Sequence, residues 1–331
     1  MATSVRQLAR DLNVSPATVS RVLNDRPGVS PELRQRILDA IRADGYPTAP
    51  QPGRSTPFVG IIVPELENPA FASLAFAIET QLARYGVTAM IGSSTLVGYA
   101  EENYVETLLR HGVHGLVLAS GSHANPEADH SLYRELSRRR VAMVLINGSV
   151  PGLPIPSIST DERLGAVLAV RHLADLGHEV IGLAGGEGFY RPSVHRLAGF
   201  RAEIARLGLN GHVAETHYTM EGGREAAEEL LAAGVTGIVA GSDVMALGAL
   251  RVAHESGLGV PRDLSVIGYD DTVLCTIATP TLTSVRQPFD WISAAVARAM
   301  SAQLSGGRPV AREMKAEPLL VARASTGPRR R

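Results

Sequence analysis

Residues 5–24, VRQLARDLNVSPATVSRVLN, decide the fold of the amino-terminal part of the chain. Apolar residues recur there at the spacing of one helix face in two groups, Val5, Leu8, Ala9 and Leu12, then Val19, Val22 and Leu23. Asn13 interrupts the first group, while Ser15 suits the N-cap of a second helix and Pro16 its first position. The stretch therefore predicts a helix–turn–helix, whose second helix can enter the major groove of DNA.

A third helix is predicted after a loop at residues 24–28. Ser30 and Pro31 repeat the cap-and-proline start, and Gly45 ends a helix whose buried side would carry Leu33, Ile37, Leu38 and Ile41. Residues 1–46 are therefore expected to form a three-helix DNA-binding domain. On periodicity alone, a small helical bundle with solvated arginines is the alternative.

The predicted recognition surface combines one long cation with small polar side chains. Arg21 can donate two hydrogen bonds to the O6 and N7 atoms of guanine, the commonest specific contact with a base. Serine and threonine hydroxyls near the amino terminus of the second helix can bind phosphates. The predicted DNA-binding set consists of Ser4, Ser15, Pro16, Ala17, Thr18, Ser20, Arg21, Asn24, Gly28 and Ser30.

Charge and composition narrow the class of protein. Residues 1–54 contain eight arginines and five carboxylates, so their net charge is +3, whereas that of the whole chain is −1. This difference weakly indicates a contact with DNA; chance fluctuation is the alternative. Cys275, the single cysteine, can form neither an internal disulfide nor a metal site. The chain has no apolar run of about 18 residues and no signal-peptide pattern, so we expect a cytoplasmic protein without membrane contact.

Residues 47–57, PTAPQPGRSTP, predict an extended linker because they contain four prolines and one glycine. From Phe58 onward, apolar strands alternate with amphipathic helices, which predicts parallel sheets covered on both faces. The strands are expected at 58–63, 87–91, 115–119, 141–146, 180–184, 213–218, 237–240, 264–269 and 319–322. The helices between them are expected at about 71–82, 100–111, 130–139, 161–176, 193–207, 222–233, 243–256 and 288–304.

These two series, joined by the proline-rich segment SVPGLPIPSI, predict an α/β body of two doubly wound lobes at residues 58–328. The first lobe is expected at about 58–157 and 286–317, and the second at about 158–285 and 318–328. Ligands of such sheets bind beyond the carboxyl ends of the strands, which here means between the lobes.

Enzyme and metal sites are not expected. No G-x-G-x-x-G follows the first strand, and neither a Walker loop nor a G-x-S-x-G element occurs. His111, His114 and His123 lie near one another in the sequence, but no carboxylate or cysteine joins them at ligand spacing, so we interpret them as surface residues. Neither a cofactor nor a metal is expected.

Residues 14–24, VSPATVSRVLN, with Val29-Ser30-Pro31 and Gly45-Tyr46, resemble the amino-terminal signature of the lactose-repressor (LacI/GalR) family. The resemblance implies that Pro16 and Ala17 set specificity, through a thymine methyl group, and that Arg21 carries most of the base readout. The chain departs from the family at its linker, which is about four residues short and has no leucine between Tyr46 and Phe58. A docking mode other than the family's leucine-bearing hinge helix is therefore an alternative.

The resemblance continues through the body, at residues 63–71, 161–166, 193–200, 242–248, 268–271, 282–288 and 323–326. It implies a cleft for a small, neutral, hydroxylated effector, bound by Phe71, Asp161, Arg196, Tyr218, Ser242 and Asp270. Ser242 stands where the family usually has asparagine. As alternatives, Arg196 and Asp270 form a structural salt bridge, Asp161 caps a helix, and Phe71 belongs to the core.

The expected function is therefore that of a ligand-responsive transcription regulator, most simply a repressor. It would bind a palindromic operator in double-stranded DNA as a homodimer or higher oligomer. Its effector would be a sugar or sugar derivative, with a nucleobase or nucleoside as the alternative. The rival functions are a solute receptor without operator specificity, a periplasmic sugar-binding protein and a doubly wound enzyme.

Overall fold

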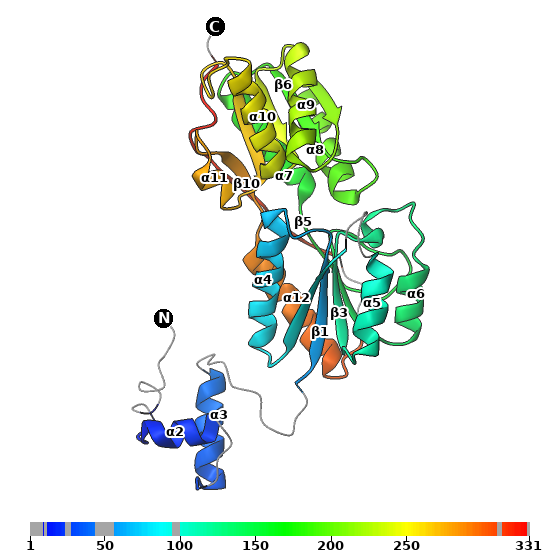
Figure 1. The fold of residues 1–331 in the computed structure, drawn as a ribbon, viewed down its shortest axis with the longest axis vertical. Helices are drawn as coiled ribbons and strands as arrows, with labels where there is room; N and C mark the ends of the chain where they lie inside the picture. The colour runs from blue at the N-terminus through cyan, green and yellow to red at the C-terminus, as the bar shows by residue number, and fades with distance from the viewer. Residues whose placement is uncertain are drawn as a thin grey trace.

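The computed structural model describes residues 9, 12–23, 28–43, 56–94, 100–309 and 313–329. Most of the expected first helix and most of the linker lie outside these ranges, as do Ser4, Asn24 and the side chain of Ser20. The described residues form two helices of an amino-terminal head and two α/β lobes, which confirms the predicted fold class (Figure 1).

The head contains α2 (Pro16–Leu23) and α3 (Pro31–Ala43), which share a small buried core of Ala9, Val19, Val22 and Ile37. The predicted N-caps are present. The Ser15 hydroxyl accepts a hydrogen bond from the Thr18 amide at 3.0 Å, and the Ser30 hydroxyl accepts one from the Leu33 amide at 3.3 Å. These caps satisfy helix-end amides that would otherwise lack a protein partner.

The first lobe is a parallel six-stranded sheet in the order β11-β5-β4-β3-β1-β2. Its strands are β1 (Phe58–Val63), β2 (Thr88–Ser93), β3 (Gly115–Ala119), β4 (Ala142–Ile146), β5 (Ser157–Thr160) and β11 (Glu313–Ala316). One face packs against α4 (Pro69–Ala83) and α12 (Phe289–Leu304). The other packs against α5 (Glu101–Arg110) and α6 (Ser131–Arg138), and the 3-10 turn η1 (Ser122–Ala124) follows β3.

The second lobe has the order β12-β10-β9-β8-β6-β7, in which only β12 runs antiparallel to its neighbour. Its strands are β6 (Val180–Gly185), β7 (Asn210–Glu215), β8 (Gly237–Ala240), β9 (Ser265–Asp270), β10 (Thr283–Arg286) and β12 (Leu319–Val321). Helices α7 (Glu162–Asp175) and α8 (Arg191–Leu207) cover one face, and α9 (Met220–Ala232) and α10 (Asp243–Glu255) the other. The short helix α11 (Leu274–Ile277) follows β9.

The described chain passes between the lobes three times, after β5, after β10 and after β11. The expected first crossing near residue 157 is wrong by about three residues, because Ser157–Thr160 pairs with β4 and β11 in the first sheet. Likewise, Arg286 ends a second-lobe strand and does not begin the returning first-lobe segment. The strands β5, β10 and β11 escaped prediction because each has four residues and no continuous apolar run.

Candidate functional site

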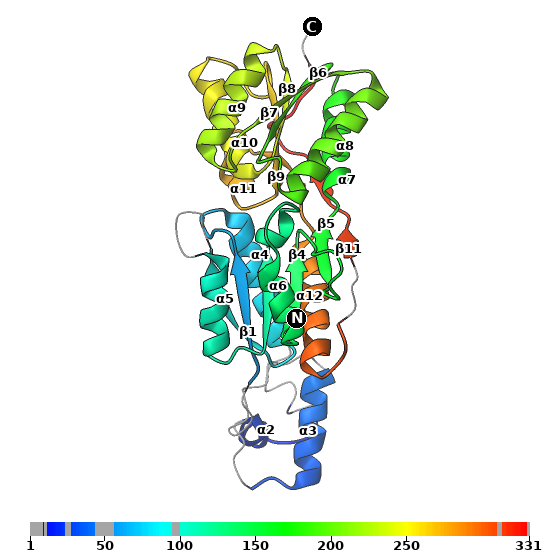
Figure 2. The ribbon, with the colours of Figure 1, turned by 90° about the vertical axis from the view of Figure 1, so that its right-hand side faces the viewer.

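The lobes face each other across the carboxyl ends of their parallel strands (Figure 2). Residues of both lobes line a pocket between them. The first lobe contributes Asn147, Ser159, Thr160, Glu313 and Lys315, and the second contributes Glu162, Arg191 and His195. Across this pocket, Nη1 of Arg191 donates a hydrogen bond to the Ser149 hydroxyl at 3.3 Å. A ligand here would contact both lobes at once.

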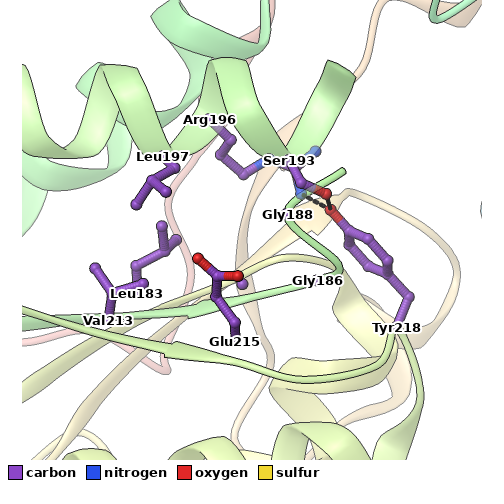
Figure 3. Close-up of a pocket in the computed structure, with 10 residues that line it drawn as sticks. Leu183, Gly186, Gly188, Ser193, Arg196, Leu197, Val213, Glu215 and Tyr218 are labelled. Atoms are coloured by element: carbon purple, nitrogen blue, oxygen red, sulfur yellow. Dashed lines mark hydrogen bonds between the residues drawn. The ribbon is translucent and has the colours of Figure 1, made fainter. Parts of the chain in front are cut away.

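A second pocket lies between the ends of β6 and β7 and helix α8 (Figure 3). Its apolar side is formed by Leu183, Leu197 and Val213, and its polar side by Ser193, Arg196, Glu215 and Tyr218. Each pocket contains about 280 Å³ of empty space when the open solvent at its mouth is included.

Arg196 is buried, and both of its terminal nitrogens are engaged within the protein. Nη2 donates to a Glu162 carboxylate oxygen at 2.6 Å, and Nη1 donates to the Gly241 carbonyl at 2.5 Å. Burial opposes the charge of the guanidinium, but Glu162, Tyr218 and Tyr269 together outweigh it, so the pKa of Arg196 lies well above its ordinary value. The alternative salt bridge with Asp270 is wrong, because the carboxylate partner of Arg196 is Glu162.

Tyr218 is fixed against the same arginine. Its hydroxyl forms a hydrogen bond with the Ser193 hydroxyl at 2.8 Å and accepts one from Nη1 of Arg196 at 3.3 Å (Figure 3). The ring lies on Gly186, where an added Cβ would come within 1.9 Å of a ring carbon, so only glycine fits. Tyr218 does not end the strand as predicted, since β7 stops at Glu215.

Asp270 links the site to the crossovers. Its carboxylate accepts a hydrogen bond from Nε2 of Gln287 at 2.6 Å, and Oε1 of Gln287 accepts one from the Thr160 hydroxyl at 2.6 Å. Burial raises the pKa of Asp270 well above its ordinary value, and nearby Asp243 raises it further. The backbone of Asp270 has a φ of +110°, a value that residues other than glycine rarely adopt. Such strained backbone conformations cluster at functional sites.

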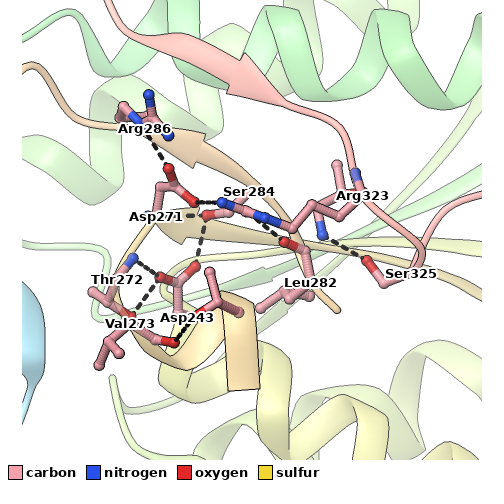
Figure 4. A network of polar contacts seen from close by, with 11 residues as sticks. Asp243, Asp271, Thr272, Val273, Leu282, Ser284, Arg286, Arg323 and Ser325 are labelled. Carbon is pink, nitrogen blue, oxygen red and sulfur yellow. Dashed lines mark hydrogen bonds and ion pairs between the residues drawn. The ribbon is translucent and has the colours of Figure 1, made fainter. Parts of the chain in front are cut away.

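A polar network that the sequence did not reveal holds the loop after β9 (Figure 4). Asp243 accepts hydrogen bonds from the Thr272 amide at 2.7 Å, the Thr272 hydroxyl at 2.9 Å and the Ser284 hydroxyl at 2.6 Å. Asp271 forms ion pairs with Arg286 and Arg323, each at 2.6 Å. The loop that carries Asp270 is therefore anchored to α10, β10 and the last part of the chain.

The remaining predicted effector residues have structural partners. Asp161 caps α7 by accepting from the Leu164 amide at 3.0 Å, and the buried Ser242 caps α10 by accepting from the Met245 amide at 3.2 Å. Phe71 is partly buried and packs against the first-lobe core. The structure thus joins Arg196 and Tyr218 in direct contact and leaves ligand contact by Phe71, Asp161 and Ser242 as a prediction. Glu162 and Ser193 were missed, although both belong to stretches that carry the family resemblance.

The interpretation of His123 as a surface residue is wrong. Its ring is fully buried, with Nδ1 3.1 Å from the Tyr133 hydroxyl and Nε2 2.9 Å from the Ile146 carbonyl. Burial lowers its pKa, which keeps the ring neutral. His111 and His114 are exposed as expected, and in the described part of the chain no three histidine, cysteine or acidic side chains form a metal-ligand group.

In the head, α2 presents an exposed Arg21 beside Gly28. Pro16, Ala17 and the capping Ser15 are also exposed at the start of this helix, while the Thr18 hydroxyl lies 2.8 Å from the Ser15 hydroxyl. This helix therefore presents a cation and a pair of mutually hydrogen-bonded hydroxyl groups. Within the described ranges, no helix is long and apolar enough to span a membrane.

Comparison with known proteins agrees with this geometry. Residues 4–48 match the model of bacterial regulatory proteins of the lacI family, and residues 170–326 match a periplasmic binding protein-like domain. The HTH-type transcriptional regulator MalR of Streptomyces coelicolor is 40% identical, over 98% of this chain and 97% of the relative. The chain belongs to the LacI family. Members of this family are DNA-binding transcription regulators and not enzymes.

Two solved structures resemble this LacI-family chain over nearly its whole length. A complex of the transcriptional regulator CelR with cellobiose superposes with a TM-score of 0.72 at 28% identity, covering 97% of this chain and 99% of the other. The lac repressor dimer bound to operator and anti-inducer superposes with a TM-score of 0.72 at 26% identity, and the match covers 99% of this chain and 100% of the other. The LacI-family fold of head and two lobes is therefore established for this chain.

Asp270→Asn is expected to raise the melting temperature more at about pH 8 than at about pH 5. The pKa of Asp270 is higher in the folded protein than in the unfolded chain. The free energy of unfolding of the wild-type protein therefore falls as the pH rises from the pKa of the unfolded state towards that of the folded state. Asparagine does not ionise, and its amide oxygen can still accept from Gln287. For each unit by which folding raises the pKa of Asp270, the gain in stability at pH 8 should exceed the gain at pH 5 by about 1.4 kcal/mol, or about 3 °C in melting temperature.

Calorimetry at both pH values would measure this. The control is Asp290→Asn, an exposed residue of α12 whose replacement should give the same small change at both pH values. An Asp270→Asn effect that does not vary with pH would show that this carboxyl is not held protonated by the fold.

Proposed function

We propose that this LacI-family regulator binds a palindromic operator as a homodimer in the cytoplasm. Binding of a neutral, hydroxylated effector, a sugar or sugar derivative, would lower or raise its affinity for that operator. The observation that carries the effector class is the pairing of Arg196 with Glu162. Glu162 neutralises the charge of Arg196, so this arginine does not attract a phosphate or carboxylate.

The remaining hydrogen-bonding capacity suits hydroxyl groups. Nε of Arg196 is buried without a protein partner, and Asp270 has one carboxylate oxygen not engaged by Gln287. The guanidinium of Arg196 can donate, and a protonated carboxyl group at Asp270 can donate or accept, which suits the hydroxyls of a sugar ring; the ring of Tyr218 suits its apolar face. The similarity to the CelR–cellobiose complex supports the same class.

Effector binding between the lobes would act by changing their relative angle. The Thr160–Gln287–Asp270 chain of hydrogen bonds and the Arg191–Ser149 contact both cross from one lobe to the other. A ligand that binds one lobe arrangement more tightly shifts the population towards it, so effector and operator affinities are linked.

An exposed apolar surface supports the homodimer. Phe76 on α4, Val273 beside α11 and Ile277 on α11 are 68%, 64% and 69% exposed, and Trp291 on α12 is 42% exposed. Figure 1 shows α4 and α11 on the same side of the molecule, one in each lobe. Exposed large apolar residues on one side of both lobes are typical of an interface between subunits.

Sugar binding is expected to stabilise the protein, and the gain should depend on Arg196. Neutral mono- and disaccharides should raise the melting temperature, whereas the corresponding sugar phosphates should not. At a ligand concentration of a hundred times Kd, the gain in the free energy of unfolding should be about 2.7 kcal/mol. Arg196→Ala should abolish the rise, and Arg201→Ala, an exposed residue of the same helix, should keep it. Stabilisation by phosphorylated sugars or by purine nucleosides alone would contradict the proposed effector class.

Arg21→Ala is expected to reduce operator discrimination by about 1–3 kcal/mol and to leave effector binding intact. The operator would be recovered by selection from sheared genomic DNA, and competition by unrelated duplex would measure discrimination. Arg36→Ala on α3, another exposed head arginine, is the control and should retain discrimination. If the wild-type protein selects no site at any salt concentration, operator binding itself is refuted.

Phe76→Glu and Ile277→Glu are each expected to convert the dimer to monomer, because a charge would be buried in an apolar interface. Sedimentation equilibrium would report the mass. Met220→Glu, which replaces a 41% exposed apolar residue on α9, is the matched control and should leave the dimer unchanged. Dimers that survive both interface changes would place the contact elsewhere.

A further inference from the structure

The end of the first lobe from which β1 starts is unusually rich in arginine. Because the strands are parallel, the last turns of α4, α5, α6 and α12 and the turns after them gather at this end. These segments, residues 80–87, 107–114, 135–141 and 301–309, contain one carboxylate, Glu135, and six arginines, namely Arg84, Arg110, Arg138, Arg139, Arg140 and Arg308. All six arginines are exposed.

The matching end of the second lobe provides an internal comparison. The last turns of α7 to α10 and the turns after them, residues 172–179, 204–209, 229–236 and 252–264, hold two arginines and five carboxylates. Cations stabilise the carboxyl ends of helices through the helix dipole, but that effect applies equally to both lobes. The arginines of the first lobe therefore need another explanation.

Arg140 strengthens this conclusion. Each of these eight helices ends in the same type of turn. In that turn a backbone amide donates a hydrogen bond to the carbonyl five residues earlier, as the Val141 amide does to the Leu136 carbonyl. The residue before that amide has a positive φ in every case, and in seven turns it is glycine: Gly86, Gly112, Gly177, Gly208, Gly234, Gly257 and Gly306. In the eighth turn it is Arg140, with φ +57°. Glycine is favoured in this conformation, so the arginine is kept there at a cost to stability.

The position of this surface indicates its partner. The chain enters the first lobe here from the head, and its first residues are bonded to the same turns: the Pro57 carbonyl accepts from the Thr88 amide, and the Phe58 carbonyl from the His114 amide. Figures 1 and 2 both show α2 and α3 beyond this end of the lobe. Among the described residues, no carboxylate forms an ion pair with Arg110, Arg138 or Arg140.

We propose that this arginine surface binds the phosphate backbone of the DNA that the head holds. Phosphate contacts add affinity and fix orientation without reading sequence, which suits flexible, exposed arginines on a rigid lobe. The inference rests on the proposed operator binding by the head. It assigns to the first lobe a direct part in DNA affinity, separate from its part in effector binding.

Arg140→Gly separates this role from a structural one. Glycine should raise the melting temperature, because it relieves the left-handed backbone. It should at the same time weaken binding to a mixed-sequence duplex and reduce the slope of log affinity against log salt by about 0.9 per protomer. Fluorescence anisotropy of the full-length protein between about 50 and 200 mM potassium chloride would measure the slope.

A triple variant, Arg138→Gln, Arg139→Gln and Arg140→Gly, should reduce the slope by up to about 2.7 per protomer. Its control removes the same charge from the second lobe, with Arg201→Gln, Arg251→Gln and Arg262→Gln, and should keep the wild-type slope. An unchanged slope in the triple variant would overturn the proposal and leave the surface for an acidic protein partner. An equal loss in the control would also overturn it, by showing that total charge alone matters.

Failure of this inference can be told from failure of operator binding. If the wild-type protein selects a site and the triple variant binds that site with the same affinity and salt slope, the head binds DNA without help from the lobe. If the wild-type protein selects no site, the proposed function fails first.

Discussion

The buried ion pair between Arg196 and Glu162 is the contact on which the second-lobe half of the cleft depends. It joins the first residue of α7 to the middle of α8, and the Gly241 carbonyl brings in the end of β8. Removing one partner of such a pair usually costs about 3–5 kcal/mol, because the other charge is left buried. The pair also fixes Tyr218 beside the arginine and decides which net charge a ligand meets there.

The first lobe is coupled to this centre by short polar contacts at the crossovers. Gln287 lies just after β10 and uses both ends of its amide, one towards Asp270 and one towards Thr160. Because the crossovers are few and lie side by side, the lobes can change their angle without disturbing either core. The Asp243 network behind Asp270 keeps the second-lobe side of this joint rigid.

Much of the fold could be predicted from sequence because long apolar strands and amphipathic helices carry strong periodic signals. The strands at 115–119 and 237–240 were predicted to the residue. The short strands β5, β10 and β11 could not be, because serine, threonine and charged residues there pair through their backbones without an apolar pattern. Arg196 was predicted from the motif at residues 193–200, whereas its partner depends on how α7 and α8 pack, which no local pattern specifies. His123 was misplaced for the same reason, since its burial follows from Tyr133 on a different helix.

Neither lobe is continuous in the sequence, and this constrains how the protein can be made. The first lobe lacks a face of its core until α12 has been synthesised and an edge strand until β11 follows, while the second lacks its last strand until residues 319–321. The ribosome therefore delivers the head about 270 residues before either lobe can close. A chain that stops before β11 would therefore carry the head without either complete lobe.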